Sequence, residues 1–140
     1  MPGIVVGIDG SSCSNMAVAE GAVLASELGE KLYVVFGYEP YRGAGEIQDH
    51  RAALEELGTE VGNTAVEQAQ EAGAEVELRM IDRGAVDALL AMADEVDARM
   101  IVVGSYGDSP LKGAILGSTP HKLVHLSKRP LLVVHGEEED

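Results

Sequence analysis

Several residue types on which whole classes of protein depend are scarce in this sequence. It contains no tryptophan, one phenylalanine and a single cysteine, Cys13. One cysteine excludes an internal disulfide and a cysteine-cluster metal site, and it is typical of a reducing compartment. Apolar runs such as residues 101–103 and 131–134 fall far below the roughly 18 residues of a membrane span, and the start lacks the pattern of a secretory signal. We therefore expect a cytoplasmic protein without a membrane segment.

Basic residues are also few. Ten Lys and Arg stand against 24 Asp and Glu, for a formal net charge of −14. A charge of this sign repels the phosphates of nucleic acids and anionic membrane surfaces, so neither is expected as a partner. The segment 104–136 is locally basic, because it holds four of the ten basic residues and a single acidic one.

The length and composition are those of one globular domain. The 140 residues are 46% hydrophobic and 24% charged, which is far from the composition of a disordered chain. No internal repeat, low-complexity tract or long linker divides the sequence. We predict a single domain over residues 1–136, followed by the acidic tail 137–140.

Short segments rich in β-branched residues alternate with longer segments of helical periodicity, which predicts a parallel α/β sheet. The expected strands are residues 3–8, 31–38, 75–81, 99–103 and 130–135. The first expected helix starts at Ser11 or Ser12 and ends at Gly29, and the second follows a loop at 39–48 and ends at Gly73. The third has its buried face at residues 86, 89, 90 and 93, and the fourth covers about 118–127. The buried faces expected of the first two helices are Ala17, Gly21, Leu24 and Leu28, then Leu54, Leu57, Val61, Ala65, Ala69 and Ala72.

This order of elements predicts a doubly wound, five-stranded parallel sheet with helices on both faces. In such sheets, ligands bind beyond the carboxyl ends of the strands, at the point where the winding reverses. The loops that follow the first and fourth strands are therefore the places to look for a site.

The segment after the fourth strand carries the most informative motif. Gly104 and Gly107 are followed by Gly117 and Ser118, which begin the last predicted helix, and Pro120 fits its first turn. Free amides at a helix N-terminus attract anions, so this segment is a candidate phosphate site. The alternative is that the glycines only form turns and the helix is merely capped. Neither a Walker P-loop nor a dinucleotide-binding fingerprint fits, because the lysine of the first and the glycine pattern of the second are missing.

The spacing Gly-x2-Gly-x9-Gly-Ser, together with Ile8-Asp9-Gly10-Ser11 after the first strand, resembles the universal stress protein family over nearly the whole sequence. The resemblance implies a strand order of 3-2-1-4-5, an ATP-binding module that acts in the stress response, and a homodimer paired through the last strand. The binding residues that it implies are Gly7, Asp9, Gly37, Val103, Gly104, Gly107, Gly117, Ser118 and Thr119.

Two positions depart from the common pattern of that family. Tyr106 stands where many members have a basic residue or histidine, and Thr119 stands where valine is frequent. The missing basic side chain disfavours tight triphosphate binding, which Thr119 and Lys112 compensate only in part. Relatives with a similar Gly-Ser-x-Pro segment bind cyclic AMP, which is therefore the alternative ligand. Mg²⁺ or Mn²⁺ would accompany a polyphosphate.

Two sets of side chains have alternative roles. Asp9 either faces the ribose of a ligand or caps the N-terminus of the first helix. His121 and His125 have the i, i+4 spacing of a metal clamp, but no acidic pair in the same helix supplies further ligands. For the two histidines we therefore expect a solvated face.

No catalytic machinery is evident in the sequence. Hydrolysis of a nucleotide needs a positioned base, metal ligands and a cation on the leaving phosphate, so we expect at most slow ATP hydrolysis or autophosphorylation. A nucleotide-using enzyme of related architecture would need faster turnover. A receiver-like switch phosphorylated on Asp9 is a weaker alternative, because Ile8 replaces the second acidic residue and His135 stands where a lysine is needed.

Overall fold

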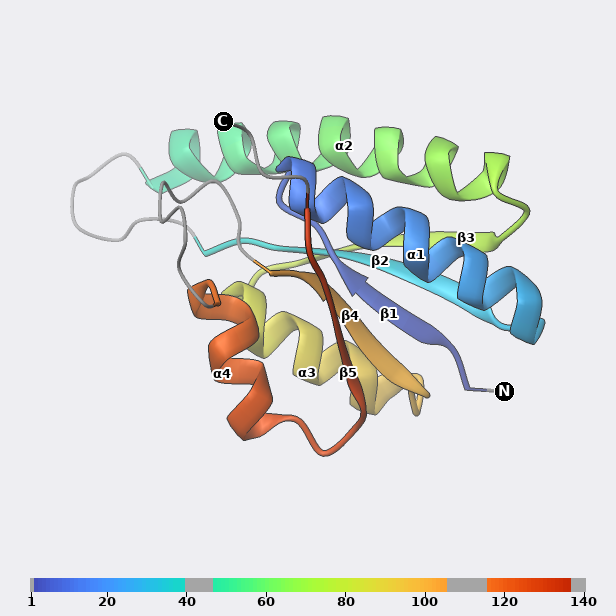
Figure 1. Ribbon diagram of the computed structural model, residues 1–140. Coiled ribbons are helices and arrows are strands. Elements are labelled where there is room, and N and C mark those ends of the chain that lie inside the picture. Colours follow the sequence, from blue (N-terminus) through green and yellow to red (C-terminus); the bar gives the residue numbers. More distant parts are fainter. Residues whose placement is uncertain (1, 40–46, 106–115, 137–140) are drawn as a thin grey trace.

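The computed structural model describes residues 2–39, 47–105 and 116–136, and within them the chain alternates strands and helices (Figure 1). The elements are β1 (Ile4–Gly7), α1 (Ser12–Leu28), β2 (Lys31–Gly37), α2 (Ile47–Glu71), β3 (Glu75–Ile81), α3 (Ala85–Glu95), β4 (Met100–Gly104), α4 (Ser118–Leu126) and β5 (Leu131–Val134). The predicted elements are confirmed, and most of their ends lie within one or two residues of the prediction. Most of the predicted loop 39–48, Gly107 and the tail 137–140 lie outside the described residues.

The five strands form one parallel sheet in the order β3-β2-β1-β4-β5. Helices α1 and α2 cover one face of the sheet, and α3 and α4 cover the other (Figure 1). The winding reverses beside β1, which pairs with β2 on one side and with β4 on the other. The doubly wound fold, the strand order and the two layers of helices are therefore as predicted.

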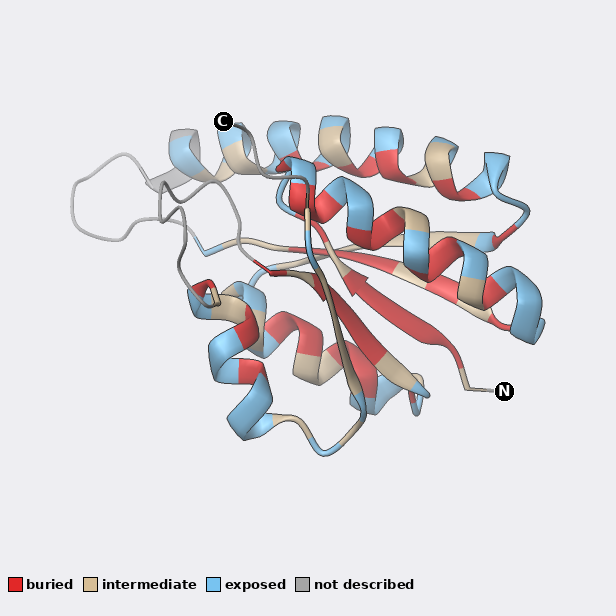
Figure 2. Cartoon of the chain, in the orientation of Figure 1, coloured by how far each residue is buried: buried red, intermediate tan, exposed pale blue. Residues whose placement is uncertain are grey.

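Two buried clusters hold the layers together. Along β1, Ile4 and Val6 pack in the cluster that includes α1, whereas Val5 packs in the cluster with α3, because successive side chains of a strand point to opposite faces. Buried residues line the central strands and the inner sides of the helices (Figure 2). The fully buried side chains of β1 and β4 place these strands at the centre of the molecule.

Caps define both ends of α1. The hydroxyl of Ser11 accepts a hydrogen bond from the backbone N–H of Ser14 at 3.2 Å, and Gly29 ends the helix in the left-handed conformation at φ +67°. The predicted face of this helix is correct at Ala17 and Gly21. It is wrong at Leu28, which is 46% exposed, because Leu28 is the last residue of α1 and the buried residues of the helix end at Ala25.

Glycines form much of the face by which α2 approaches the sheet. Gly58 and Gly62 are buried, whereas Leu57 and Ala72, which we expected to be buried, are exposed. A methyl group on Gly58 would lie 2.5 Å from a ring carbon of Phe36. The predicted face is correct at Ala65 and Ala69, which are buried, and wrong at Leu57 and Ala72, because a hydrophobic pattern does not count glycine as an interior residue.

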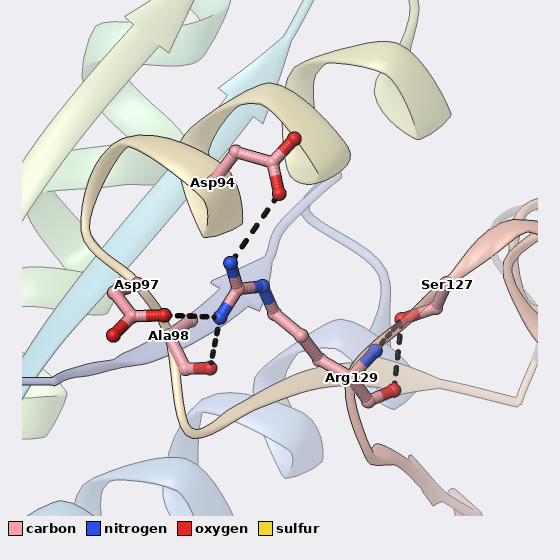
Figure 3. A network of polar contacts seen from close by, with 5 residues as sticks. All are labelled: Asp94, Asp97, Ala98, Ser127 and Arg129. Atoms are coloured by element: carbon pink, nitrogen blue, oxygen red, sulfur yellow. Dashed lines mark hydrogen bonds and ion pairs between the residues drawn. The ribbon is translucent and has the colours of Figure 1, made fainter.

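Arg129 ties the α4–β5 connection to the end of α3 (Figure 3). Its guanidinium donates to the carboxylate of Asp97 and to the carbonyl oxygen of Ala98, both at 2.9 Å, and lies 3.4 Å from the carboxylate of Asp94. The Ser127 hydroxyl donates to the carbonyl of Arg129 and accepts from its N–H, at 2.8 and 3.1 Å. These bonds fix the segment that joins α4 to β5.

Candidate functional site

A cavity of about 240 Å³ opens beyond the carboxyl ends of β1, β2 and β4, where the winding of the sheet reverses. This is the edge at which doubly wound sheets bind ligands. The described residues that line it are Gly7, Ile8, Asp9, Ser11, Ser14, Val35, Gly37, Ala85, Leu89, Val103, Gly104, Gly117, Ser118, Thr119 and Pro120.

The structure brings the predicted site residues together around this cavity. Eight of the nine line it, namely Gly7, Asp9, Gly37, Val103, Gly104, Gly117, Ser118 and Thr119. The ninth, Gly107, lies outside the described residues, as do Tyr106 and Lys112. The predictions came from the ends of three strands and from the start of α4. The parallel pairing of β1 with β2 and β4 brings the strand ends side by side, and a hydrogen bond from the N–H of Gly117 to the carbonyl of Ser105 joins α4 to the end of β4.

Sequence reasoning missed the apolar wall of the cavity. Val35, Ala85 and Leu89 line it, and Leu89 packs so closely on β1 that a methyl group on Gly7 would lie 3.0 Å from its side chain. Val35 is the register partner of Gly7, so the pairing of β1 with β2 would have identified it once the strand order was assumed. No local motif marks Ala85 or Leu89, because they enter the site through the packing of α3.

Two of the glycines are required by packing behind the cavity. A methyl group on Gly104 would lie 2.8 Å from the backbone of Cys13 in α1, and one on Gly37 would lie 2.8 Å from the side chain of Ala88 in α3. Side chains at these positions would push the helices away from the sheet. The two glycines therefore shape the cavity by letting α1 and α3 approach the strand ends.

The N-terminus of α4 forms the polar end of the cavity. Gly117 is the N-cap residue, with φ −69° and ψ 173°, and among the described residues no side chain caps the helix. The N–H of Gly117 donates to the carbonyl of Ser105 at 2.7 Å, which anchors the start of the helix to the end of β4. The following amides, of Ser118 and Thr119, belong to the first turn, whose N–H groups have no acceptor within the helix. This end of α4 is thus arranged to receive an anion.

Asp9 is held at the mouth of the cavity by two serines of the next turn. Its carboxylate accepts from the N–H of Ser11 at 2.8 Å, and its own N–H donates to the hydroxyl of Ser14 at 3.1 Å. Because Ser11 is the N-cap of α1, the capping role that we considered for Asp9 belongs to Ser11. Asp9 is the one carboxylate among the described lining residues, which include no Lys, Arg or His.

His121 and His125 lie on α4 outside this cavity and are both exposed, as predicted. Over the described ranges, no group of three or more His, Cys, Asp and Glu side chains is placed to hold a metal ion. None of the described helices is long and apolar enough to cross a membrane.

The fold and the cavity define a doubly wound α/β protein with a cavity at its switch point. Residues 2–135 match the universal stress protein family, and the chain belongs to that family. It is 38% identical to a universal stress protein of Mycobacterium tuberculosis, over 94% of each chain.

Solved structures of universal stress proteins share both the fold and part of the sequence. A crystal structure of a universal stress protein in complex with cAMP has a TM-score of 0.77 and 33% identity, over 97% of this chain and 98% of that one. The universal stress protein from Archaeoglobus fulgidus in complex with dAMP has a TM-score of 0.73 and 27% identity, over 96% and 98%.

Proposed function

We propose that this chain binds an adenine nucleotide in the cavity at the switch point. One observation carries the proposal: the same cavity has an apolar wall and, at its other end, the N-terminus of a helix that no described side chain caps. The base would lie against Val35, Ala85 and Leu89, and a phosphate would lie against the first turn of α4. The ligands of the two solved relatives, cAMP and dAMP, support the assignment.

ATP and cyclic AMP are the two candidates within this class. The motif implies ATP, but each further phosphate brings more negative charge to a protein of net charge −14. The described lining offers one carboxylate and no cationic side chain, which favours the single phosphate of cyclic AMP. Binding of ATP is favoured when Mg²⁺ or Mn²⁺ accompanies it, with Asp9 as an oxygen ligand of the type that these ions prefer. Without the ion, Asp9 would face the ribose hydroxyls.

Calorimetric titration with ATP, ADP, AMP and cyclic AMP, each with and without Mg²⁺, tests the proposal. We expect saturable binding of at least one of them, and no binding at millimolar concentration would refute it. In Gly117→Val, the added side chain should block the proposed phosphate position at the first turn of α4. The backbone angles of Gly117 suit any residue, so the fold should persist by circular dichroism. Normal binding by this variant would show that the phosphate lies elsewhere.

We further propose that residues 1–136 act as one regulatory domain in the cytoplasm, whose ligand changes its contacts with a partner. Among the described lining residues, Asp9 bonds to Ser11 and Ser14 only through backbone N–H groups, and no carboxylate or imidazole accepts a hydrogen bond from a hydroxyl, so binding rather than rapid catalysis fits the cavity best. Within the described residues, β5 pairs only with β4, which leaves its outer edge available for a second copy of the chain. A homodimer through β5 would cover that edge.

A further inference from the structure

Helix α4 presents two imidazoles to solvent on one side. His121 and His125 are four residues apart, which places them one above the other on the helix surface. Their ring centroids lie 5.2 Å apart, with an angle of 75° between the ring planes. Both residues are exposed, and neither lines the nucleotide cavity.

This separation matches the geometry of two imidazoles on one metal ion. A zinc–nitrogen bond is about 2.0 Å, and a ring nitrogen lies about 1.1 Å from the ring centre, so two rings on a tetrahedral ion have centroids about 5 Å apart. The rings of His121 and His125 already have this spacing without a bound ion. The centroid spacing therefore requires no change in the helix, and rotation of the side chains sets the direction of the ring nitrogens.

The surrounding charge is on balance favourable to a cation. His125 lies in the last turn of α4, where the helix dipole favours positive charge, and the whole protein carries a net charge of −14. Lys122 of the same helix opposes binding, because like charges repel. Two neutral nitrogen ligands of this kind suit Zn²⁺, Ni²⁺ and Cu²⁺ better than Mg²⁺ or Ca²⁺, which prefer oxygen.

We propose that His121 and His125 form a surface site for a divalent transition-metal ion. The protein supplies two nitrogen ligands, and water completes the coordination. The site is open, unlike structural zinc sites with four protein ligands, so the ion can exchange and can accept an external ligand. The site is separate from the nucleotide cavity and does not depend on the function proposed above.

Titration of the untagged full chain with ZnCl₂ and with NiCl₂ tests the site. We expect one ion per chain at neutral pH. The variant His121→Ala should bind about tenfold more weakly or worse. Unchanged affinity in this variant would overturn the proposal, as would the absence of binding by the wild-type chain.

A matched control keeps the number of histidines and changes only their spacing. In His125→Ala combined with Leu126→His, the second imidazole is displaced by about 100° around the helix. Leu126 is 55% exposed, so the exchange should leave the fold intact. We expect this double variant to bind as weakly as His121→Ala. Wild-type affinity in the double variant would mean that the two imidazoles bind independently, and the proposed site would be wrong.

Discussion

At the scale of single residues, Gly58 determines how closely α2 approaches the sheet. A methyl group at this position would lie 2.5 Å from a ring carbon of Phe36 and 2.8 Å from the terminal methyl of Met80. Phe36 is buried and stacked on Tyr38, with 6.2 Å between the ring centroids, so its ring cannot move aside freely. The close approach of helix and strand therefore depends on the missing side chain.

We predict that Gly58→Ala destabilises the protein by about 1–3 kcal/mol, which is the usual cost of overpacking. The sign of this change in stability is diagnostic, because replacing a glycine within a helix by alanine normally stabilises the protein by about 1 kcal/mol. Asn63→Ala, on the exposed side of the same helix, should gain roughly 0.5 kcal/mol. Urea unfolding of the two variants gives the comparison, and a gain in stability at Gly58 would contradict the packing that we describe.

Glu30 is the second residue on which a prediction rests. Its side chain is only 5% exposed, and Arg99 donates two hydrogen bonds to one of its carboxylate oxygens, one of them at 2.6 Å. The other oxygen, Oε2, is buried without a hydrogen-bond partner among the described residues. Arg99 holds the pKa of Glu30 below its ordinary value, although burial alone would raise it.

A lowered pKa in the folded state means that ionised Glu30 stabilises the fold above its ordinary pKa, and that this contribution disappears as the pH falls through the folded-state pKa. In Arg99→Gln, the unpaired carboxylate is buried and its pKa rises. We expect this variant to be less stable than wild type at pH 7, with a difference that narrows as the pH approaches about 4.5. Chemical denaturation at several pH values measures this difference in stability. The double variant Arg99→Gln with Glu30→Gln should recover much of the stability that Arg99→Gln loses. A difference independent of pH would exclude the titration of Glu30 as its cause.

At the scale of elements, the sequence predicts helix ends best, because the residues that form them act through local backbone geometry. Ser11 and Gly29 begin and end α1 as expected, because a hydroxyl cap and a left-handed glycine are local requirements. The buried faces were harder to predict, as Leu57 and Leu28 show, because burial depends on which side and which part of a helix meets the sheet. The apolar wall of the cavity was missed for the same reason, since Leu89 reaches it only through tertiary packing.

The N-terminus of α4 gives a prediction that separates binding from stability. In Ser118→Glu, the new carboxylate lies at the positive end of the helix dipole, so stability should stay constant or rise by about 0.3–1 kcal/mol. The same carboxylate occupies and repels the proposed phosphate site, so nucleotide affinity should fall at least about tenfold. Asn63→Glu adds the same charge on α2, away from the cavity, and should leave affinity unchanged. Equal losses of nucleotide affinity in both variants would show that the added net charge, and not its position on α4, weakens binding.

At the scale of the whole molecule, β5 is one of the two edge strands of the sheet in the described chain, and β3 is the other. The carbonyl of Pro130 accepts a hydrogen bond from the N–H of Ile101 in β4 at 3.0 Å, and that of Val134 accepts one from Ser105, just after β4, at 2.9 Å. Because backbone groups alternate along a strand, the N–H groups of Leu131 and Val133 point away from β4. These outward groups are the ones that a second copy of the chain would use.

Val133→Pro should therefore abolish the proposed homodimer while leaving the sheet within each chain intact. Proline removes the outward N–H of residue 133, and proline is tolerated on edge strands because the inward hydrogen bonds do not involve that group. Val133→Ala retains the N–H and loses comparable packing, so it should still dimerise. Light scattering at micromolar concentration should give twice the 14.7 kDa chain mass for wild type and for Val133→Ala, and a single chain mass for Val133→Pro. If Val133→Pro is still a dimer, the interface lies on another surface. If the wild-type chain is a monomer, the β5 edge is unpaired in solution and the proposed homodimer is wrong.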